Sequence, residues 1–296
     1  MSLFDEPKVD THCHLFDPRR FPYAADVSYR PQGQEIGDQA SFERLMDCFG
    51  VRHALLVGPN SGYNFDNRYL LHAIATGEGR FKGIAVVPGD TGGDELAQLK
   101  ENGIVGVAFN VALNGLDYYL PILLPLLGKL EQLGMWAQLQ VSGDQLLELL
   151  PVLERSHTRL LIDHCGRPEL SRGLAQPGFQ ALLTLGRERR AVVKLSGEVK
   201  FSNERFPFAD TQPYLDALID AFGSEQCLWG SDWPYLRAPF RLDYGPMLKR
   251  WEQAFDAQQR RQIMWDNPVR FFGFGSSPPC QRHRSGGDCS QVQNQR

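Results

Sequence analysis

The sequence lacks the features of a membrane-spanning, disulfide-rich or nucleic-acid-binding protein. Its longest apolar run, at 118–127, is interrupted by Pro121 and Pro125 and is too short to cross a bilayer. Six cysteines without regular spacing in 296 residues do not form a disulfide framework. Lys and Arg number 31 against 35 Asp and Glu, so no basic excess is available to neutralise a phosphate backbone. We therefore expect no membrane and no nucleic-acid partner.

Two further absences narrow the class of protein. Residues 1–8 contain Asp5 and Glu6 and have no apolar core of the signal-peptide kind. No glycine-rich phosphate-binding turn follows the first apolar run, which disfavours a nucleotide-binding sheet. The chain does have 42% hydrophobic residues, enough for a sizeable buried core. We expect a cytoplasmic enzyme with a small-molecule substrate, and the sequence leaves its oligomeric state open.

Short apolar runs typical of strands alternate with helical patterns along most of the chain. The predicted strands span 8–16, 53–58, 81–87, 105–112, 135–141, 159–164, 191–196 and 227–231. The predicted helices span 41–49, 67–76, 93–102, 121–133, 144–155, 178–189, 213–222, 245–255 and 257–265. Such alternation implies parallel strands with right-handed crossovers, and eight strands close a barrel. The predicted fold is α/β, a single-domain (β/α)8 TIM barrel over residues 1–274, with a doubly wound open sheet as the competing architecture.

Two segments stand outside the repeating pattern. Residues 17–39 follow the first strand, are polar and rich in proline and aromatics, and would cover the catalytic face of a barrel. Residues 275–296 contain almost no apolar side chains, so we expect a disordered tail. For that reason Cys280, His283 and Cys289 are not interpreted as a metal site.

Two histidines lie one residue apart at the end of the first predicted strand, in Val9-Asp10-Thr11-His12-Cys13-His14. Side chains alternate along a strand, so His12 and His14 point the same way and Cys13 points to the other face. In a barrel the shared direction is the mouth. Two imidazoles there can bind one metal ion or both contact a substrate oxygen. The alternative, two histidines without a joint role, is disfavoured because strand interiors seldom hold such a pair.

The sixth predicted strand ends in a third histidine, in Leu161-Ile162-Asp163-His164-Cys165-Gly166-Arg167-Pro168. His164 is expected at the same barrel face as the first pair. Strand alternation turns Asp163 the opposite way, as a structural or supporting group. A single buried histidine is more often structural, but its position beside the other two favours a functional role.

The eighth predicted strand ends in Asp232, in Cys227-Leu228-Trp229-Gly230-Ser231-Asp232-Trp233-Pro234. A carboxylate at this place can ligate a metal or take a proton from an attacking water. The structural alternative is an Asp in a turn or at a helix N-cap. Four such groups at the carboxyl ends of three strands are what a barrel active site requires: His12, His14, His164 and Asp232.

These motifs, taken in order, resemble the amidohydrolase superfamily and more narrowly its lactonase branch, which includes 2-pyrone-4,6-dicarboxylate lactonase and the sugar-acid lactonases. They are Asp10-Thr11-His12-Cys13-His14, Ile162-Asp163-His164-Cys165-Gly166-Arg167-Pro168, Lys194-Leu195-Ser196-Gly197 and Trp229-Gly230-Ser231-Asp232-Trp233-Pro234. The resemblance runs from 8 to 274, where 268–274 is similar to the closing helix of these barrels.

The resemblance implies a hydrolase that opens the ester bond of a small acidic or sugar-derived lactone. Asp232 would act as general base on the attacking water. His12, His14 and His164 would polarise the lactone carbonyl, directly or through a metal.

Four residues are candidates for substrate binding. Tyr29 stands at the position of a substrate-contacting tyrosine in the resembled enzymes. Asn110, at the end of the fourth strand, either orients the substrate or satisfies backbone groups. Lys194, on the seventh strand, is a candidate contact for an anionic substrate, and Trp233 either lines the pocket or packs in the core or at the rim.

One departure from the pyrone-dicarboxylate enzyme concerns its substrate. That enzyme presents a carboxylate-clamping Arg just before Phe-Asn on the fourth strand, whereas this chain has Ala108 there. Bidentate carboxylate recognition depends on such an arginine, so the substrate is not assigned to pyrone dicarboxylate. The candidate replacements are Arg30, Lys200, Arg205 and Arg237.

The cofactor is either none or one divalent metal, Zn²⁺ or Mn²⁺. Binuclear members of the superfamily carry a bridging Lys or Glu on strand four and a His on strand five, and this chain has neither in 105–112 or 135–141. A single ion would be held by His12, His14, His164 and Asp232.

Three alternative functions stay open at this level. A metal-dependent decarboxylase of the related aromatic-acid group shares the histidine pair and the strand-eight Asp, although the segment 162–168 is more similar to the lactonases. A lactone isomerase could use the same base and carbonyl contacts. A non-catalytic barrel that only binds a ligand is disfavoured because every expected catalytic group is present.

Overall fold

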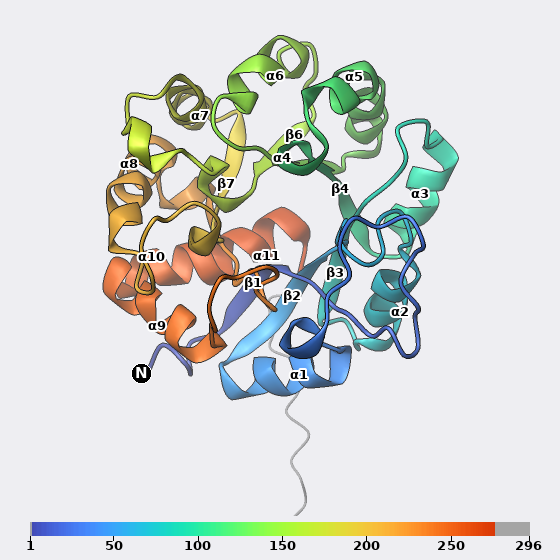
Figure 1. The fold of residues 1–296 in the computed structure, drawn as a ribbon, viewed down its shortest axis with the longest axis horizontal. Helices are drawn as coiled ribbons and strands as arrows, with labels where there is room; N and C mark the ends of the chain where they lie inside the picture. Colours follow the sequence, from blue (N-terminus) through green and yellow to red (C-terminus); the bar gives the residue numbers. More distant parts are fainter. Residues whose placement is uncertain (1, 276–296) are drawn as a thin grey trace, which may run out of the picture.

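The computed structural model describes residues 2–275, and its eight strands form one sheet in sequence order (Figure 1). Each strand from β1 to β8 pairs in parallel with the next. The strands are β1 Lys8–Cys13, β2 Val51–Val57, β3 Phe81–Ala85, β4 Ile104–Asn110, β5 Trp136–Gln140, β6 Arg159–Ile162, β7 Ala191–Leu195 and β8 Cys227–Trp229. The predicted (β/α)8 barrel is confirmed.

Helices follow the strands and surround the sheet (Figure 1). They are α1 Gln39–Cys48, α2 Arg68–Thr76, α3 Gly93–Glu101, α4 Val111–Asn114, α5 Leu116–Leu133, α6 Gln145–Leu153, α7 Pro177–Arg187, α8 Gln212–Phe222, α9 Tyr244–Ala254, α10 Ala257–Arg261 and α11 Asn267–Phe272. Helix α5 starts before the predicted residue 121 and carries Pro121 and Pro125 within it.

The barrel closes between β8 and β1 through residues at and just beyond their carboxyl ends. Cys13 and Trp233 form a parallel bridge. The backbone N–H of His14 donates to the carbonyl of Trp233, and that of Asp232 donates to the carbonyl of His12, both at 2.8 Å. Because these hydrogen bonds join the segments that carry the histidine pair and Asp232, closure of the barrel sets their relative position.

Apolar side chains form two layers. The larger cluster lies between the strands and the outer helices and includes Leu56, Leu123 and Leu182. The smaller one fills the interior of the barrel beneath the strand ends and is closed by residues from α11 and its neighbours: Val9, Leu55, Ile84, Leu161, Leu228, Trp265, Phe272 and Phe274. Burial of these side chains supplies the main favourable free energy of the fold. The opposite end of the barrel is left for polar groups.

Within residues 2–275, no helix combines the length and the apolarity that a membrane span needs. The predicted tail 275–296 lies outside the described residues except for Gly275, and so do Cys280, His283 and Cys289.

Candidate active site

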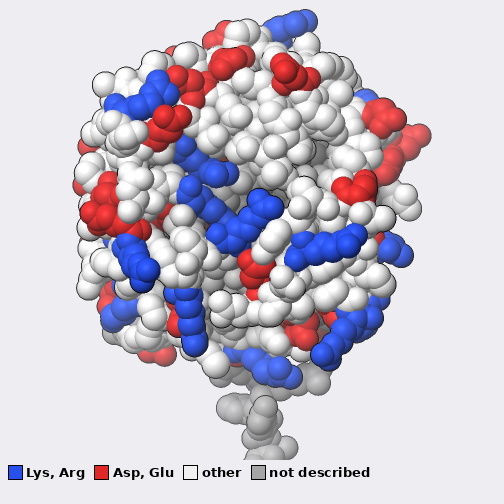
Figure 2. Space-filling view, in the orientation of Figure 1, with Lys and Arg blue, Asp and Glu red and all other residues white. Residues whose placement is uncertain are grey.

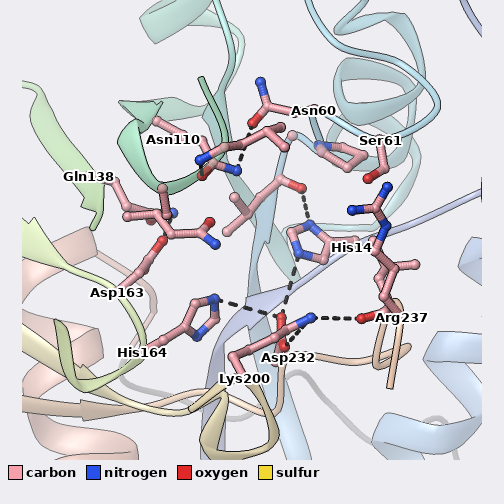
Figure 3. Close-up of a pocket in the computed structure, with 18 of the residues that line it drawn as sticks. His14, Asn60, Ser61, Asn110, Gln138, Asp163, His164, Lys200, Asp232 and Arg237 are labelled. Carbon is pink, nitrogen blue, oxygen red and sulfur yellow. Dashed lines mark hydrogen bonds and ion pairs between the residues drawn. The ribbon is translucent and has the colours of Figure 1, made fainter. Parts of the chain in front are cut away.

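A cavity of about 400 Å³ opens at the carboxyl ends of the strands (Figure 3). Its size is within the range of small-molecule sites. The ends of β4 and β5 line it, together with residues that follow β1, β2, β6, β7 and β8. The loops of a barrel carry its chemistry at this end.

Three histidines converge on one carboxylate oxygen of Asp232. The distances from the Nε2 atoms of His12, His14 and His164 to Asp232 Oδ1 are 3.8, 3.7 and 3.9 Å. The side chains of His12, His164 and Asp232 are almost fully buried, whereas that of His14 is 12% exposed. The structure thus brings together the four residues that the sequence singled out from three separate strands.

Two glycines of the sequence motifs make room for the histidines. A Cβ on Gly230 would lie 2.6 Å from the Cβ of His12, and one on Gly197 would lie 2.4 Å from Nδ1 of His164. Gly197 also has φ of 63°, which favours glycine. These contacts give a steric reason for glycine in the segments that follow β7 and β8.

Two of the site residues have left-handed backbone conformations. The φ angles of His164 and Asp232 are 50° and 60°. Non-glycine residues adopt this region at a cost of about 1–3 kcal/mol, and such outliers cluster at functional sites. Hydrogen bonds from Ser231 N and Tyr244 Oη to the buried carboxylate of Asp10, both 2.9 Å, hold the chain around Asp232 in place.

The partners of the Nδ1 atoms determine what each histidine presents to the cavity. His14 Nδ1 lies 2.8 Å from the carbonyl oxygen of Val57, so it carries the proton of a neutral ring and leaves Nε2 as an acceptor. His164 Nδ1 lies 3.0 Å from the hydroxyl of Ser196, which can donate to it. His164 can therefore present an Nε2–H group, whereas the Nδ1 contact of His14 directs a lone pair of Nε2 at the cavity.

A buried charged network lies beneath His12. The ammonium of Lys194 is 2.6 Å from Gln138 Oε1, and both Lys194 Nζ and His12 Nδ1 are 3.2 Å from Asp163 Oδ1. Gln138 Nε2 donates to the other oxygen of Asp163 at 2.8 Å. Burial alone would raise the pKa of Asp163, but Lys194 and His12 hold it well below its usual value. Each charge in the network is paired, and Lys194 Nζ is also 3.2 Å from His12 Nδ1.

The predicted direction of Asp163 is wrong. Its side chain points into the barrel and lines the same cavity as His164 (Figure 3). The alternation rule fails because β6 ends at Ile162 and His164 has left-handed backbone angles. Asp163 does support another group, as expected, because it binds His12.

Asp232 is ionised in its buried position. Burial alone would raise the pKa of this carboxyl, but Lys200 and His164 hold it well below the usual range. Lys200 Nζ lies 3.4 Å from Asp232 Oδ2 and donates to the carbonyl of Leu236 at 2.7 Å. Burial lowers the pKa of His12, and it lowers that of His164 to about 3, so both rings are neutral near pH 7.

The segment that carries Lys200 is anchored by a buried ion pair. Glu198, 1% exposed, binds the guanidinium of Arg250 on α9 with distances of 2.6 to 3.0 Å. Thr211 donates its hydroxyl proton to Glu198 at 2.6 Å. This pair was not predicted from the sequence, because a lone Glu and Arg 52 positions apart form no local pattern.

The mouth of the cavity is cationic. Arg167, Lys200 and Arg237 line it, and Figure 2 shows Lys and Arg side chains gathered near the centre of the visible face. Lys200 and Arg237 were predicted only as candidate replacements for the strand-four arginine, and Arg167 was not predicted. Arg167 could have been recognised from its position in the glycine-containing turn that follows β6, two residues after Cys165. Its Nε atom is buried without a hydrogen-bond partner in the described residues.

Of the four residues proposed to bind substrate, Asn110 lines the cavity. The other three lie outside the lining. Lys194 is fully buried in the network beneath His12, Trp233 stacks on Phe42 with ring centroids 4.9 Å apart, and Tyr29 packs against Arg237. These three side chains do not line the cavity, because an inward strand position or a nearby motif does not determine which atoms reach it, and their contact with a substrate stays a prediction. Ala108 does line it.

His12, His14 and Asp232 could hold a single divalent ion, because their ligand atoms all lie within 4.8 Å of one another, whereas His164 falls outside this group. Bonds of about 2.0–2.2 Å in a tetrahedron set ligand atoms about 3.3–3.6 Å apart, and the Nε2–Oδ1 distances of 3.8 Å for His12 and 3.7 Å for His14 are only slightly wider. The His14 hydrogen bond to Val57 leaves the Nε2 lone pair directed at the site, as in histidine ligands generally. The donor set suits Zn²⁺ or Mn²⁺.

Comparisons with known proteins extend over nearly the whole barrel. A family model described as Amidohydrolase matches residues 9–274. A 4-sulfomuconolactone hydrolase of Rhizobium radiobacter is 30% identical over 273 residues, which cover 89% of each chain. A 2-pyrone-4,6-dicarboxylate hydrolase of Comamonas testosteroni is 26% identical over 277 residues, again 89% of each chain.

A solved structure from Acinetobacter baumannii, assigned as a 2-pyrone-4,6-dicarboxylic acid hydrolase with citric acid bound, has a TM-score of 0.81 and 29% identity. The match covers 91% of this chain and 100% of that chain.

Proposed function

The chain belongs to the amidohydrolase family, and from this premise we propose that it hydrolyses the ester bond of a small lactone that carries an anionic group. The observation that carries the proposal is the convergence of three histidine Nε2 atoms on the ionised Asp232, below a mouth lined by three cations. The names of the two curated relatives, a sulfomuconolactone and a pyrone-dicarboxylate hydrolase, both describe lactones with anionic substituents.

The attacking water is bound between Asp232 and His14. Both present acceptors, because Asp232 is ionised and the Nδ1–H of His14 donates to the carbonyl of Val57, which leaves the lone pair on Nε2. A water in this position donates one hydrogen to each and directs its lone pair at the lactone carbonyl. Asp232 then takes the proton as the bond to the carbonyl carbon forms.

The negative charge that develops on the carbonyl oxygen is stabilised by His164. The hydroxyl of Ser196 can donate to Nδ1 of His164, so that this ring presents an Nε2–H group, whereas His12 donates from Nδ1 to Asp163 and directs the lone pair of Nε2 at the site. Preorganised donors in a buried site cost no reorganisation during the reaction. The tetrahedral intermediate then collapses, the ring C–O bond breaks, and the proton on Asp232 passes to the leaving oxygen.

When bound, a divalent ion held by the Nε2 atoms of His12 and His14 and by Asp232 would supply Lewis-acid polarisation of the carbonyl. His164 is outside this set and keeps its Nε2–H group. Lys194 and Asp163 orient His12, and Val57 orients His14.

The anionic group of the substrate is attracted by the cations of the mouth. Lys200 is already paired with Asp232, whereas the Nε of Arg167 has no partner among the described residues. Burial lowers the pKa of Arg167 and Asp232 opposes this effect, so the guanidinium lies within electrostatic reach of the reacting carboxylate. Arg167 therefore serves as a bidentate contact for a carboxylate near the ester, a role that Ala108 cannot fill.

The test is hydrolysis of a lactone panel, followed by pH indicator and by mass spectrometry of the ring-opened acid. The panel contains pyrone dicarboxylate, muconolactones and sugar lactones, and metal content is measured before and after chelation. Asp232→Asn should lower kcat/KM by about 10²–10⁴-fold with an unchanged thermal midpoint, because it removes the general base. Asp243→Asn, an exposed carboxylate paired with Arg241, is the matched control and should leave the rate unchanged.

Turnover of no anionic lactone, or an Asp232→Asn variant as active as the wild type, would overturn the proposal. A product of unchanged mass but altered ring would instead identify a lactone isomerase.

A further inference from the structure

Arg237 presents an unpaired guanidinium to the cavity. It lies between β8 and α9, lines the cavity, and is close to Ser61 and His14 on the side opposite Gln138 and Asp163 (Figure 3). Within residues 2–275 its side chain makes no hydrogen bond or ion pair. An exposed arginine without partners is usually mobile, yet this one is held in place.

Two residues of the loop that follows β1 hold Arg237. Its guanidinium carbon is 4.3 Å from the centroid of the Tyr29 ring. The Tyr29 hydroxyl donates to Glu35 Oε2 at 2.5 Å, and the backbone N–H of Arg237 donates to Glu35 Oε1 at 2.7 Å. The three residues form a closed unit that joins the loops after β1 and β8.

This unit leaves the binding capacity of Arg237 intact. A cation–π contact uses the face of the guanidinium and none of its N–H groups, so all five donors stay available. Both carboxylate oxygens of Glu35 are engaged, one by the Tyr29 hydroxyl and one by the backbone. Fixing a long side chain before a ligand arrives reduces the entropy lost on binding.

The other cations that could replace the missing strand-four arginine either lie outside the lining of the cavity or are paired with a carboxylate. Arg30 donates to the backbone carbonyl of Ala25 at 3.1 Å. The guanidinium of Arg205 is 5.5 Å from the ring of Phe240, outside the lining of the cavity. Lys200 is paired with Asp232.

We propose that Arg237 binds the anionic substituent of the lactone that is remote from the scissile ester, and that Tyr29 and Glu35 are positioning residues for it. The inference rests on the proposed function and names its substrate class: lactones with a carboxylate or sulfonate on a ring carbon away from the ester. The substituent is remote because Arg237 is exposed at the rim, whereas Asp232 and the histidines are buried at the base.

The first test compares one lactone ring with and without the remote anionic group. Arg237→Gln should raise KM for the anionic lactone by about 10–100-fold, the usual value of a hydrogen bond to a charged group, and change kcat less than about threefold. For the neutral analogue KM should stay the same. The matched control is Arg241→Gln, on the same loop but paired with Asp243 outside the cavity, which should change neither constant.

The second test separates positioning from structural support. Tyr29→Leu removes the ring, and Tyr29→Phe keeps the ring but loses the hydrogen bond to Glu35. Tyr29→Leu should raise KM for the anionic lactone by about tenfold, and Tyr29→Phe should raise it by less. Both increases should be smaller than the one caused by Arg237→Gln. In the Arg237→Gln background, Tyr29→Leu should add nothing. An equal effect of Tyr29→Leu with and without Arg237 would overturn the positioning role.

A binding experiment makes the subsite testable without turnover. Calorimetry compares pyridine-2,4-dicarboxylate with pyridine-2-carboxylate, two planar acids that differ by one carboxylate. The wild type should bind the diacid at least about tenfold more tightly, and Arg237→Gln should abolish the difference. Equal affinities for the two acids in the wild type would overturn the subsite. A diacid preference that depends on Arg237 in a protein that opens no lactone would support the subsite and reject the proposed function.

Discussion

The base of the cavity and its rim are built in different ways. At the base, Lys194, Asp163 and Gln138 are buried and mutually paired beneath His12. At the rim, Arg167 and Arg237 come from loops and have guanidinium donors that no described residue uses. The base determines the orientation of the reacting groups, and the rim determines which charged molecule is attracted to them.

This difference indicates why one barrel can serve several lactones. Groups tied to strands and to a buried network cannot move without breaking paired charges. They should therefore act in the same way on every lactone that fits the cavity. In the proposed mechanism, the cations of the rim contribute affinity but take no part in the attack of water. Changes at the base should therefore affect stability and turnover for every lactone, whereas changes at the rim should affect only anionic ones.

The largest effect is expected from Lys194→Met at the base. Removal of the ammonium leaves Asp163 as an uncompensated buried charge, which costs about 3–5 kcal/mol of the free energy of unfolding. Urea denaturation measures this loss. The double variant Lys194→Met/Asp163→Asn should recover a large part of it, and Lys249→Met, which breaks an exposed ion pair, should have little effect. A single variant as stable as the wild type would contradict the assigned pairing.

A smaller effect is expected from Arg167→Met at the rim. Loss of its charge should raise KM for anionic lactones by about 10–100-fold while the free energy of unfolding stays the same, because the guanidinium has no partner to leave unpaired. Steady-state kinetics on anionic and neutral lactones measures the contrast. An equal rise in KM for anionic and neutral lactones would mean that Arg167 acts on every substrate, as the groups at the base do, and does not select for anionic ones.

The smallest effect is expected from pH. The active state has ionised Asp232 and neutral His12 and His164, and the pKa values of all three are lowered in the fold. A lowered pKa means that protonation begins only at lower pH, so these three groups should change kcat/KM less than about twofold between pH 8 and pH 5. Lys200→Met should move the acid limb of Asp232 upward, because Lys200 stabilises the carboxylate. Titration of the His12 or His164 ring near pH 6.5, followed by NMR, would contradict these assignments.

Local pattern was sufficient for most of the fold. Strand and helix periodicity predicted the eight strands, and alternation correctly placed His12 and His14 on one side with the Cys13 thiol packed on the other. The same rule failed for Asp163, because the strand ends before it and His164 adopts a left-handed conformation. Alternation is a property of extended backbone and carries no information beyond the last strand residue.

The rim was less predictable than the base. Tyr29 was predicted to contact the substrate, and its contact with Arg237 was not predicted. Arg167 was not identified, and the ion pair between Glu198 and Arg250 joins residues that are distant in sequence. Loop side chains are positioned by contacts across the mouth, which no single segment encodes.

The sequence by itself determined the barrel, the histidines and aspartate at its strand ends, and the absence of an arginine at Ala108, because each follows from local periodicity or from the identity of one residue. Only the tertiary structure decided that Lys194 lies beneath His12, that Arg167 and Arg237 face the cavity, and that Tyr29 and Glu35 hold Arg237. The physical reason is that these contacts join separate loops and strands, and their geometry exists only once β8 closes against β1.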